Sequence, residues 1–120
     1  MDFENVDKID FYLSSSEFPD MLNPRKCRIL KRLKYKLRDD FALIEVEPSI
    51  MYDDKRNGNM ELKYLIIASR HVGFSVFSIR KFPMYVYICK LINNSIVYSD
   101  IYDLQADDFI NIAWGELCSP

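Results

Sequence analysis

The sequence predicts an α+β domain: an antiparallel sheet of about five strands, with two N-terminal helices and a short C-terminal helix packed on it. Three observations favour this class. Residues 61–91 contain runs rich in Ile, Val, Tyr and Phe, residues 5–14 and 24–38 carry apolar side chains at helical spacing, and two carboxylates open the last apolar segment. With 120 residues, 49% of them hydrophobic and 28% charged, the chain is expected to form one globular domain, 1–120.

The first predicted element is a short helix over residues 5–14. Val6, Ile9 and Leu13 recur at helical spacing, and Asn5 can cap the first turn. Three serines then break the pattern, so a loop is expected before the next element.

The second predicted helix follows Asn23, which would cap it, and has Pro24 in its first position. Its apolar residues recur every three or four positions and are Cys27, Leu30, Leu33 and Leu37. The positions between them carry eight cations and no carboxylate: Arg25, Lys26, Arg28, Lys31, Arg32, Lys34, Lys36 and Arg38. The alternation of Leu33, Tyr35 and Leu37 also fits a strand, so an extended last turn remains an alternative.

The strands of the sheet come next. Residues 41–46 predict a strand that ends before Pro48, which cannot donate a ladder hydrogen bond, and residues 50–52 can continue it. The polar stretch 53–59 contains an Asn-Gly pair and predicts an exposed loop. The remaining predicted strands are 62–68, 74–79, 84–91 and 96–98, the first three of them in an antiparallel meander.

The strands 62–68 and 84–91 have apolar residues in both parities. A strand with that pattern is covered on both faces, so these two are expected at the centre of the sheet.

The last predicted element is a helix from about Ala106 to Trp114. Asp107 and Asp108 would lie in its first turn, where the helix dipole favours negative charge, and Gly115 would end it. The chain is therefore expected to be basic in its second helix and acidic at its C-terminal end.

The residues that could carry chemistry form no catalytic or metal-binding pattern. Cys27, Cys89 and Cys118 are widely spaced and lie in no CxxC pair, which favours free thiols over a zinc site. The single histidine, His71, could serve as a general base, but a role at the end of a strand is favoured for a lone histidine. Glycine motifs for phosphate are absent, so no cofactor, metal or enzymatic activity is predicted.

The amino-terminal ten residues are acidic and polar, the reverse of a signal peptide. No apolar run reaches the length of a membrane span. A cytoplasmic location is expected.

Four segments, ALIEVEPSI, LIIASRHVGFSVFSI, FPMYVYIC and IAWGEL, resemble small bacterial immunity proteins of toxin and immunity gene pairs, as in contact-dependent growth inhibition. The resemblance covers residues 25–118 and lies at the turns Arg70-His71-x-Gly73, Phe82-Pro83 and Trp114-Gly115-Glu116. It implies an inhibitor that binds a cognate toxin domain, with a cytoplasm-acting nuclease as the expected toxin, and that is not an enzyme.

A small nucleic-acid-binding or regulatory module that uses the basic segment 25–38 is the alternative. The net charge of −2 and the single aromatic residue among the cations, Tyr35, speak against it.

An inhibitor of a nuclease can offer carboxylates to a cationic cleft and use aromatic side chains as buried anchors. The predicted partner-binding residues are Asp53, Asp54, Asp100, Asp103, Asp107, Asp108, Tyr52, Tyr98, Tyr102 and Phe109. Arg70 is predicted to form a structural ion pair with Glu116.

Overall fold

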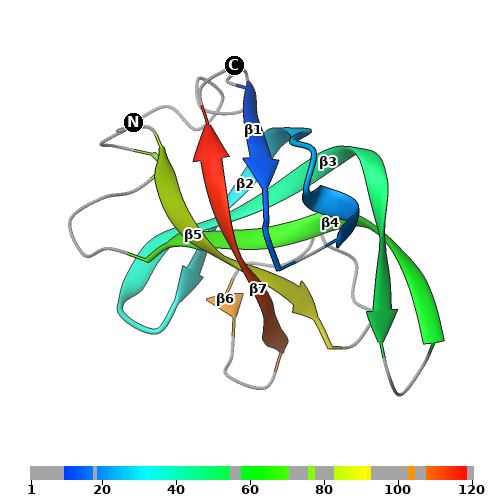
Figure 1. Ribbon diagram of the computed structural model, residues 1–120. Coiled ribbons are helices and arrows are strands. Elements are labelled where there is room, and N and C mark those ends of the chain that lie inside the picture. The colour runs from blue at the N-terminus through cyan, green and yellow to red at the C-terminus, as the bar shows by residue number, and fades with distance from the viewer. Residues whose placement is uncertain are drawn as a thin grey trace.

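The computed structural model describes residues 10–17, 19–54, 58–70, 76–77, 83–92, 103–104 and 108–118. This part of the chain forms one sheet of seven strands (Figure 1). The strands are β1 (Asp10–Ser14), β2 (Arg25–Tyr35), β3 (Arg38–Asp54), β4 (Gly58–Ser69), β5 (Met84–Leu91), β6 (Asp103–Leu104) and β7 (Phe109–Cys118). A single 3-10 turn, η1 (Pro19–Met21), precedes β2.

The sheet closes on itself. Its strand order is β1-β7-β5-β4-β3-β2-β6, and β1 also pairs with β2, so the first six of these strands form a barrel. Leu13 of β1 shows the closure, because it stands opposite Leu117 of β7 on one side and Arg25 of β2 on the other. All pairings are antiparallel except the short one between β2 and β6. Closure satisfies backbone groups that an open sheet would leave unpaired at its edges.

The barrel interior is filled by every second residue of its strands, as the two-residue period of a strand requires. Ile44, Leu65, Ile67, Val86 and Ile88 are all fully buried there. Two further segments contribute to the same core, and their buried side chains are Met21 from η1 and Val76 and Phe77 from the connection between β4 and β5.

A second apolar cluster lies on the opposite face of β3, β4 and β5. Its buried members are Leu33, Phe41, Leu43, Ile66, Ala68, Cys89 and Leu91. Tyr35, Phe41 and Phe109 extend it as an aromatic group, with ring centroids 4.9–5.8 Å apart. β4 is therefore covered on both faces over residues 64–68, which confirms the expectation for 62–68. β5 is covered on both faces only from Tyr87 onward, because Tyr85 is 46% exposed.

The predicted α+β class is wrong, because the described chain is nearly all antiparallel sheet. The predicted helix 24–38 is β2 with the turn into β3, and the second half of the predicted helix 106–114 begins β7. Residues 10–14 of the first predicted helix form β1, while 5–9 lie outside the described residues.

Bulges explain how two of these strands imitate helices. Ile29 pairs with Ile44 and Lys31 with Leu43, so Leu30 is an extra residue in β2. In β7, Ile112 is the extra residue, because Ala113 pairs with Ile88 and Asn111 with Cys89. At a bulge, two consecutive residues stand opposite one residue of the neighbouring strand. The inward-pointing side chains on either side of the bulge are therefore three positions apart in the sequence, where a regular strand has two.

Most of the other strand predictions are confirmed. Residues 41–46 and 50–52 lie in β3, 62–68 lie in β4, and 84–91 coincide with β5. The predicted meander of 62–68, 74–79 and 84–91 is wrong, because β4 pairs directly with β5, and the other antiparallel neighbour of β4 is β3.

The structure tests the remaining connections only in part. Pairing of β3 with β4 continues to Asp54 and Gly58, so the predicted loop 53–59 is the end of a hairpin that extends beyond the barrel (Figure 1). Of the predicted strand 74–79, the described Val76 and Phe77 lie in a turn, and 96–98 lies outside the described residues. No helix among the described residues is long and apolar enough to cross a membrane.

Candidate protein-interaction surfaces

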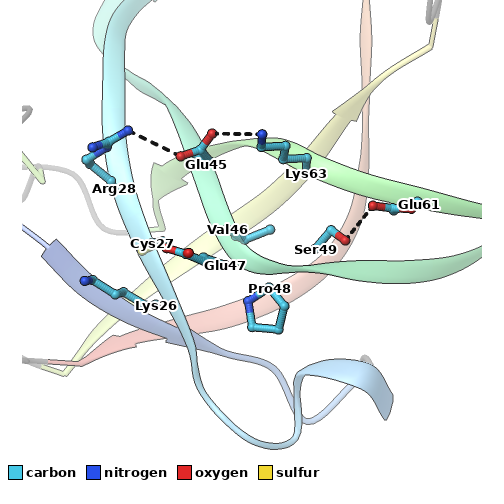
Figure 2. A pocket seen from close by; sticks show the side chains of 10 residues that line it. All are labelled: Lys26, Cys27, Arg28, Glu45, Val46, Glu47, Pro48, Ser49, Glu61 and Lys63. Carbon is cyan, nitrogen blue, oxygen red and sulfur yellow. Dashed lines mark hydrogen bonds and ion pairs between the residues drawn. The ribbon is translucent and has the colours of Figure 1, made fainter.

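A groove opens where β3 separates from β4. Glu45 pairs with Tyr64 and Ile50 with Leu62, so residues 46–49 stand opposite Lys63 alone. Pro48 lies in this bulge, where its missing N–H donor removes no ladder hydrogen bond. The groove has a volume of about 550 Å³ (Figure 2). Its charged lining, which we call the charged face, consists of Lys26, Arg28, Glu45, Glu47, Glu61 and Lys63.

The charges of this face largely neutralise one another. Glu45 lies between two cations, 3.3 Å from Arg28 Nη2 and 3.6 Å from Lys63 Nζ (Figure 2). The hydroxyl of Ser49 donates a 2.7 Å hydrogen bond to Glu61. With three cations and three carboxylates, the groove has no net charge with which to attract a phosphate chain.

The arginines of the basic segment 25–38 are paired in the same way. Arg25, Arg28, Arg32 and Arg38 each lie 2.7–3.7 Å from a carboxylate oxygen. Arg38 binds Asp40 through two hydrogen bonds of 2.7 and 2.8 Å, and these raise the pKa of the guanidinium above its usual value. Much of the positive charge that the sequence concentrates in this segment is therefore balanced by neighbouring strands and turns.

Unlike the charged face, the outer side of β1, β5 and β7 carries exposed aromatic side chains. Directly opposite residues share a face, so Tyr87 and Trp114 form one row across β5 and β7, and Tyr85 and Glu116 form the next. Tyr85 is 46% exposed and Trp114 38% exposed. We call the exposed group Tyr12, Tyr85 and Trp114, together with Arg70, the aromatic face. Beside it lies a hollow of about 340 Å³, with Leu22, Glu116 and three serines in its lining.

Arg70 is held against the indole ring of Trp114. Its guanidinium carbon lies 3.5 Å from the ring centroid. The backbone N–H of Arg70 donates a 3.0 Å hydrogen bond to the backbone carbonyl of Tyr85. Tyr87 packs on Trp114, with ring centroids 4.8 Å apart. The expected ion pair between Arg70 and Glu116 is absent from the described residues, and the arginine contacts Trp114 instead.

The backbone of Trp114 is held by side chains that take the place of a neighbouring strand. The hydroxyl of Ser15 donates to the Trp114 carbonyl at 2.6 Å, and the Trp114 N–H donates to Glu17 Oε1 at 2.7 Å. The Ser15 hydroxyl also accepts a 3.2 Å hydrogen bond from the Glu17 N–H. These contacts protect the edge of β7 just beyond the point where its pairing with β1 ends.

Gly115 allows β1, β5 and β7 to approach closely beneath this face. A Cβ atom at position 115 would lie 2.5 Å from Ile88 Cδ1 and 3.1 Å from the carbonyl oxygen of Ser14. A side chain at this position would force Ile88 to move and would crowd the Ser14 carbonyl.

The predicted partner-binding residues that the structure describes lie in two separate regions. Tyr52 is half-buried against the barrel core, and Asp53 is exposed near the end of the β3–β4 hairpin, where Asp54 closes β3. Asp103 lies in β6, beside Lys34 of β2.

Asp108 and Phe109, at the start of β7, lie in the same region as Asp103, because Tyr35 stands opposite Leu104 and packs on Phe109. Both are half-buried, and Phe109 packs on Tyr35 and Phe41. The structure thus does not bring the described members of the predicted set together. The other predicted residues, Asp100, Asp107, Tyr98 and Tyr102, lie outside the described residues.

The candidate nucleophiles do not form a reactive group in the described chain. Burial raises the pKa of the Cys89 thiol to about 12, although a hydrogen bond with Asn111 opposes this shift. A thiol with such a pKa stays protonated and is a poor nucleophile. Among the described residues no three His, Cys, Asp or Glu side chains are close enough to hold a metal ion, and His71 lies outside them.

Comparison with known proteins finds no matching family, curated protein or solved structure.

Sequence reasoning missed the aromatic face. The signal for it was present in β5, where Met84, Val86 and Ile88 alternate with Tyr85 and Tyr87 and so leave both tyrosines on the outer side. In β7 a helix was predicted, so the position of Trp114 on the same outer side as Tyr87 was not recognised.

Proposed function

We propose that this chain is an immunity protein: it binds a cognate toxin domain through the aromatic face and blocks it, in the cytoplasm and without catalysing a reaction. The observation that carries the proposal is the exposed Trp114, with Arg70 stacked on it and Tyr85 in the next row. Trp, Tyr and Arg are the residue types in which protein interfaces concentrate their binding energy. The toxin as partner is suggested by the resemblance of residues 25–118 to immunity proteins.

The support for the aromatic face as the contact is physical. Large apolar side chains that gather on one side of a monomer mark interaction sites more often than single exposed ones do. The Trp114 side chain also packs between Tyr87 and Arg70, so little side-chain freedom would be lost when a partner docks.

The proposal is tested by co-expression with the toxin domain encoded beside this gene. We expect a stable complex and protection of growth. Trp114→Ala and Tyr85→Ala should each lower the affinity by ~30-fold, the equivalent of the about 2 kcal/mol that defines an interface hot spot.

Ile92→Ala is the matched control, because Ile92 is an exposed apolar residue just after β5, at the opposite end of that strand from Tyr85. It should bind and protect as the unaltered chain does. Melting temperatures of all variants separate loss of binding from loss of folding. Absence of any complex with the neighbouring toxin domain, together with absence of protection, would refute the proposed function.

A further inference from the structure

We infer that the aromatic face recognises a carboxylate of the partner protein, and that Arg70, fixed on Trp114, is the group that binds it. The inference rests on the proposed function and names the chemistry that the partner must present.

The first argument is the state of Arg70. The guanidinium carbon of Arg70 lies 3.5 Å from the centroid of the Trp114 ring. An aromatic ring accepts no hydrogen bond from the in-plane N–H donors of a guanidinium stacked on it, so such donors remain available for an anion. The four arginines Arg25, Arg28, Arg32 and Arg38 each have a carboxylate within ion-pair distance. Arg70 is exposed and has none among the described residues. An arginine whose orientation is already fixed pays little entropy when it binds a carboxylate through two hydrogen bonds.

The second argument is the shape around it. The hollow beside Arg70 has a volume of about 340 Å³, enough for a protruding side chain, and Tyr85 and Trp114 form apolar parts of its wall. When a partner covers these rings, water leaves the site, and an ion pair is stronger in the lower dielectric that results.

The third argument concerns which anion Arg70 binds, a carboxylate of a protein or a phosphate of a nucleic acid. Glu116 lines the same hollow, and among the described residues its carboxylate accepts only from the Cys118 thiol at 3.9 Å. A chain of phosphates would place repeated negative charge against Glu116, whereas a single carboxylate bound at the edge of Arg70 meets this repulsion once. The geometry therefore favours an acidic residue of a protein over nucleic acid.

The experiment measures the affinity of the neighbouring toxin domain for four forms of the full chain: unaltered, Arg70→Lys, Glu116→Gln and Arg28→Lys. Arg70→Lys keeps the charge but loses the stacked, two-toothed geometry, and we expect affinity to fall by ~10-fold or more, as for a lost hydrogen bond to a charged group. Glu116→Gln removes the like charge from the hollow and should strengthen binding. Arg28→Lys, on the charged face, should bind as the unaltered chain does.

The outcomes separate the two proposals. A complex that is unaffected by Arg70→Lys, or weakened by Glu116→Gln, overturns the carboxylate inference and leaves the proposed function standing. No complex with the unaltered chain overturns the function and the inference together. Binding to a short single-stranded RNA at physiological salt that is lost in Arg70→Lys would assign Arg70 to a phosphate and overturn the inference in favour of nucleic acid.

Discussion

The two outer faces of this barrel use charge in opposite ways. The charged face carries six ionisable side chains, but its cations and carboxylates are equal in number, and Arg28 and Lys63 both form ion pairs with Glu45. The aromatic face carries few charges, but Arg70 contacts a ring and no carboxylate among the described residues. The density of charge in a sequence is therefore a poor guide to where a partner binds. What matters is which groups the fold leaves without a counterpart.

The faces also differ in how firmly the fold holds them. The ion pairs of the charged face join side chains that are more than half exposed in Arg28 and Lys63, and such pairs add little to stability. The aromatic face rests on the close contact at Gly115 and on hydrogen bonds to the Trp114 backbone. Substitutions beneath the aromatic face should therefore cost more than substitutions among the charges.

The largest effect is expected from Gly115→Ala. The added methyl group would overlap Ile88 Cδ1 and crowd the Ser14 carbonyl, so we expect a loss of about 3 kcal/mol, the upper end for overpacking. Urea denaturation measures it. Gly58→Asn is the comparison, because position 58 has open space, so its cost reflects only the positive φ of 80° and no steric overlap. An unchanged midpoint for Gly115→Ala would contradict the close approach of β1, β5 and β7.

Ser15→Ala should have the next largest effect. Ser15 is only 4% exposed, and removal of its hydroxyl takes away the donor to the Trp114 carbonyl and the acceptor for the Glu17 N–H. A part-buried carbonyl left without a partner should cost about 2 kcal/mol in the free energy of unfolding. Ser16→Ala, at an exposed neighbour, should change stability by less than about 0.5 kcal/mol. Equal melting temperatures for the two variants would contradict the role given to Ser15.

Glu45→Gln tests the charged face. It removes the carboxylate shared by Arg28 and Lys63 and should cost only about 0.2–1 kcal/mol, since both cations are well exposed. The difference should shrink as salt rises, because salt screens exposed charges. Glu47→Gln is the comparison in the same groove: Glu47 stands opposite Lys26, whereas Glu45 is shared by two cations, so its salt-dependent change should be smaller. A salt-independent loss larger than that of Ser15→Ala would reverse the ranking of the two faces.

The smallest change concerns reactivity and leaves stability intact. Burial, and then the charge and hydrogen bond of Glu116, raise the pKa of the Cys118 thiol. Glu116→Gln should therefore lower that pKa, increase the thiolate fraction at about pH 8 and speed alkylation by iodoacetamide. Cys27, which is 1% exposed beneath the charged face, should stay unmodified in both forms. Mass spectrometry of the modified cysteines follows both rates, and a slower reaction in Glu116→Gln would contradict the assigned cause.

The central strands could be predicted because their sequence carries the pattern of a strand covered on both sides. In 62–68 and in the second half of 84–91 the two parities fill two different clusters, the barrel core and the outer cluster around Phe41 and Leu43, whereas Tyr85 in the first half stays exposed. No bulge interrupts the inward alternation of β5 as far as Ile88. In such segments the period is read directly from the residues.

The helices were wrongly predicted for a physical reason that a single sequence does not reveal. Leu30 in β2 and Ile112 in β7 are bulged, and each moves the following apolar residues to the other parity. Cys27 lies in the barrel core, whereas Leu30 and Leu33 belong to the outer cluster, so the helix-like spacing of these three residues combines two faces of one strand. A bulge is set by the neighbouring strand, so only the assembled sheet distinguishes the two interpretations.

The candidate site was missed for a related reason. The contact between Arg70 and Trp114 joins the end of β4 to the middle of β7 across β5, and that depends on the strand order. The sequence predicted both Arg70 and Glu116 as structural, but the choice of the indole as the partner of Arg70 follows from register alone.

Closure of the barrel by β1 has a consequence for how the chain folds during synthesis. The contact between Ser15 and Trp114 spans 99 positions, and β1 can join β7 only after nearly the whole chain has been made. Until then the β5 edge that later pairs with β7 stays open, and such edges pair readily with other chains. Folding dominated by distant strand pairs is also slow. A ribosome that stalls before β7 would release a chain prone to aggregate, so rapid completion of translation should matter more for this protein than for one built from local helices.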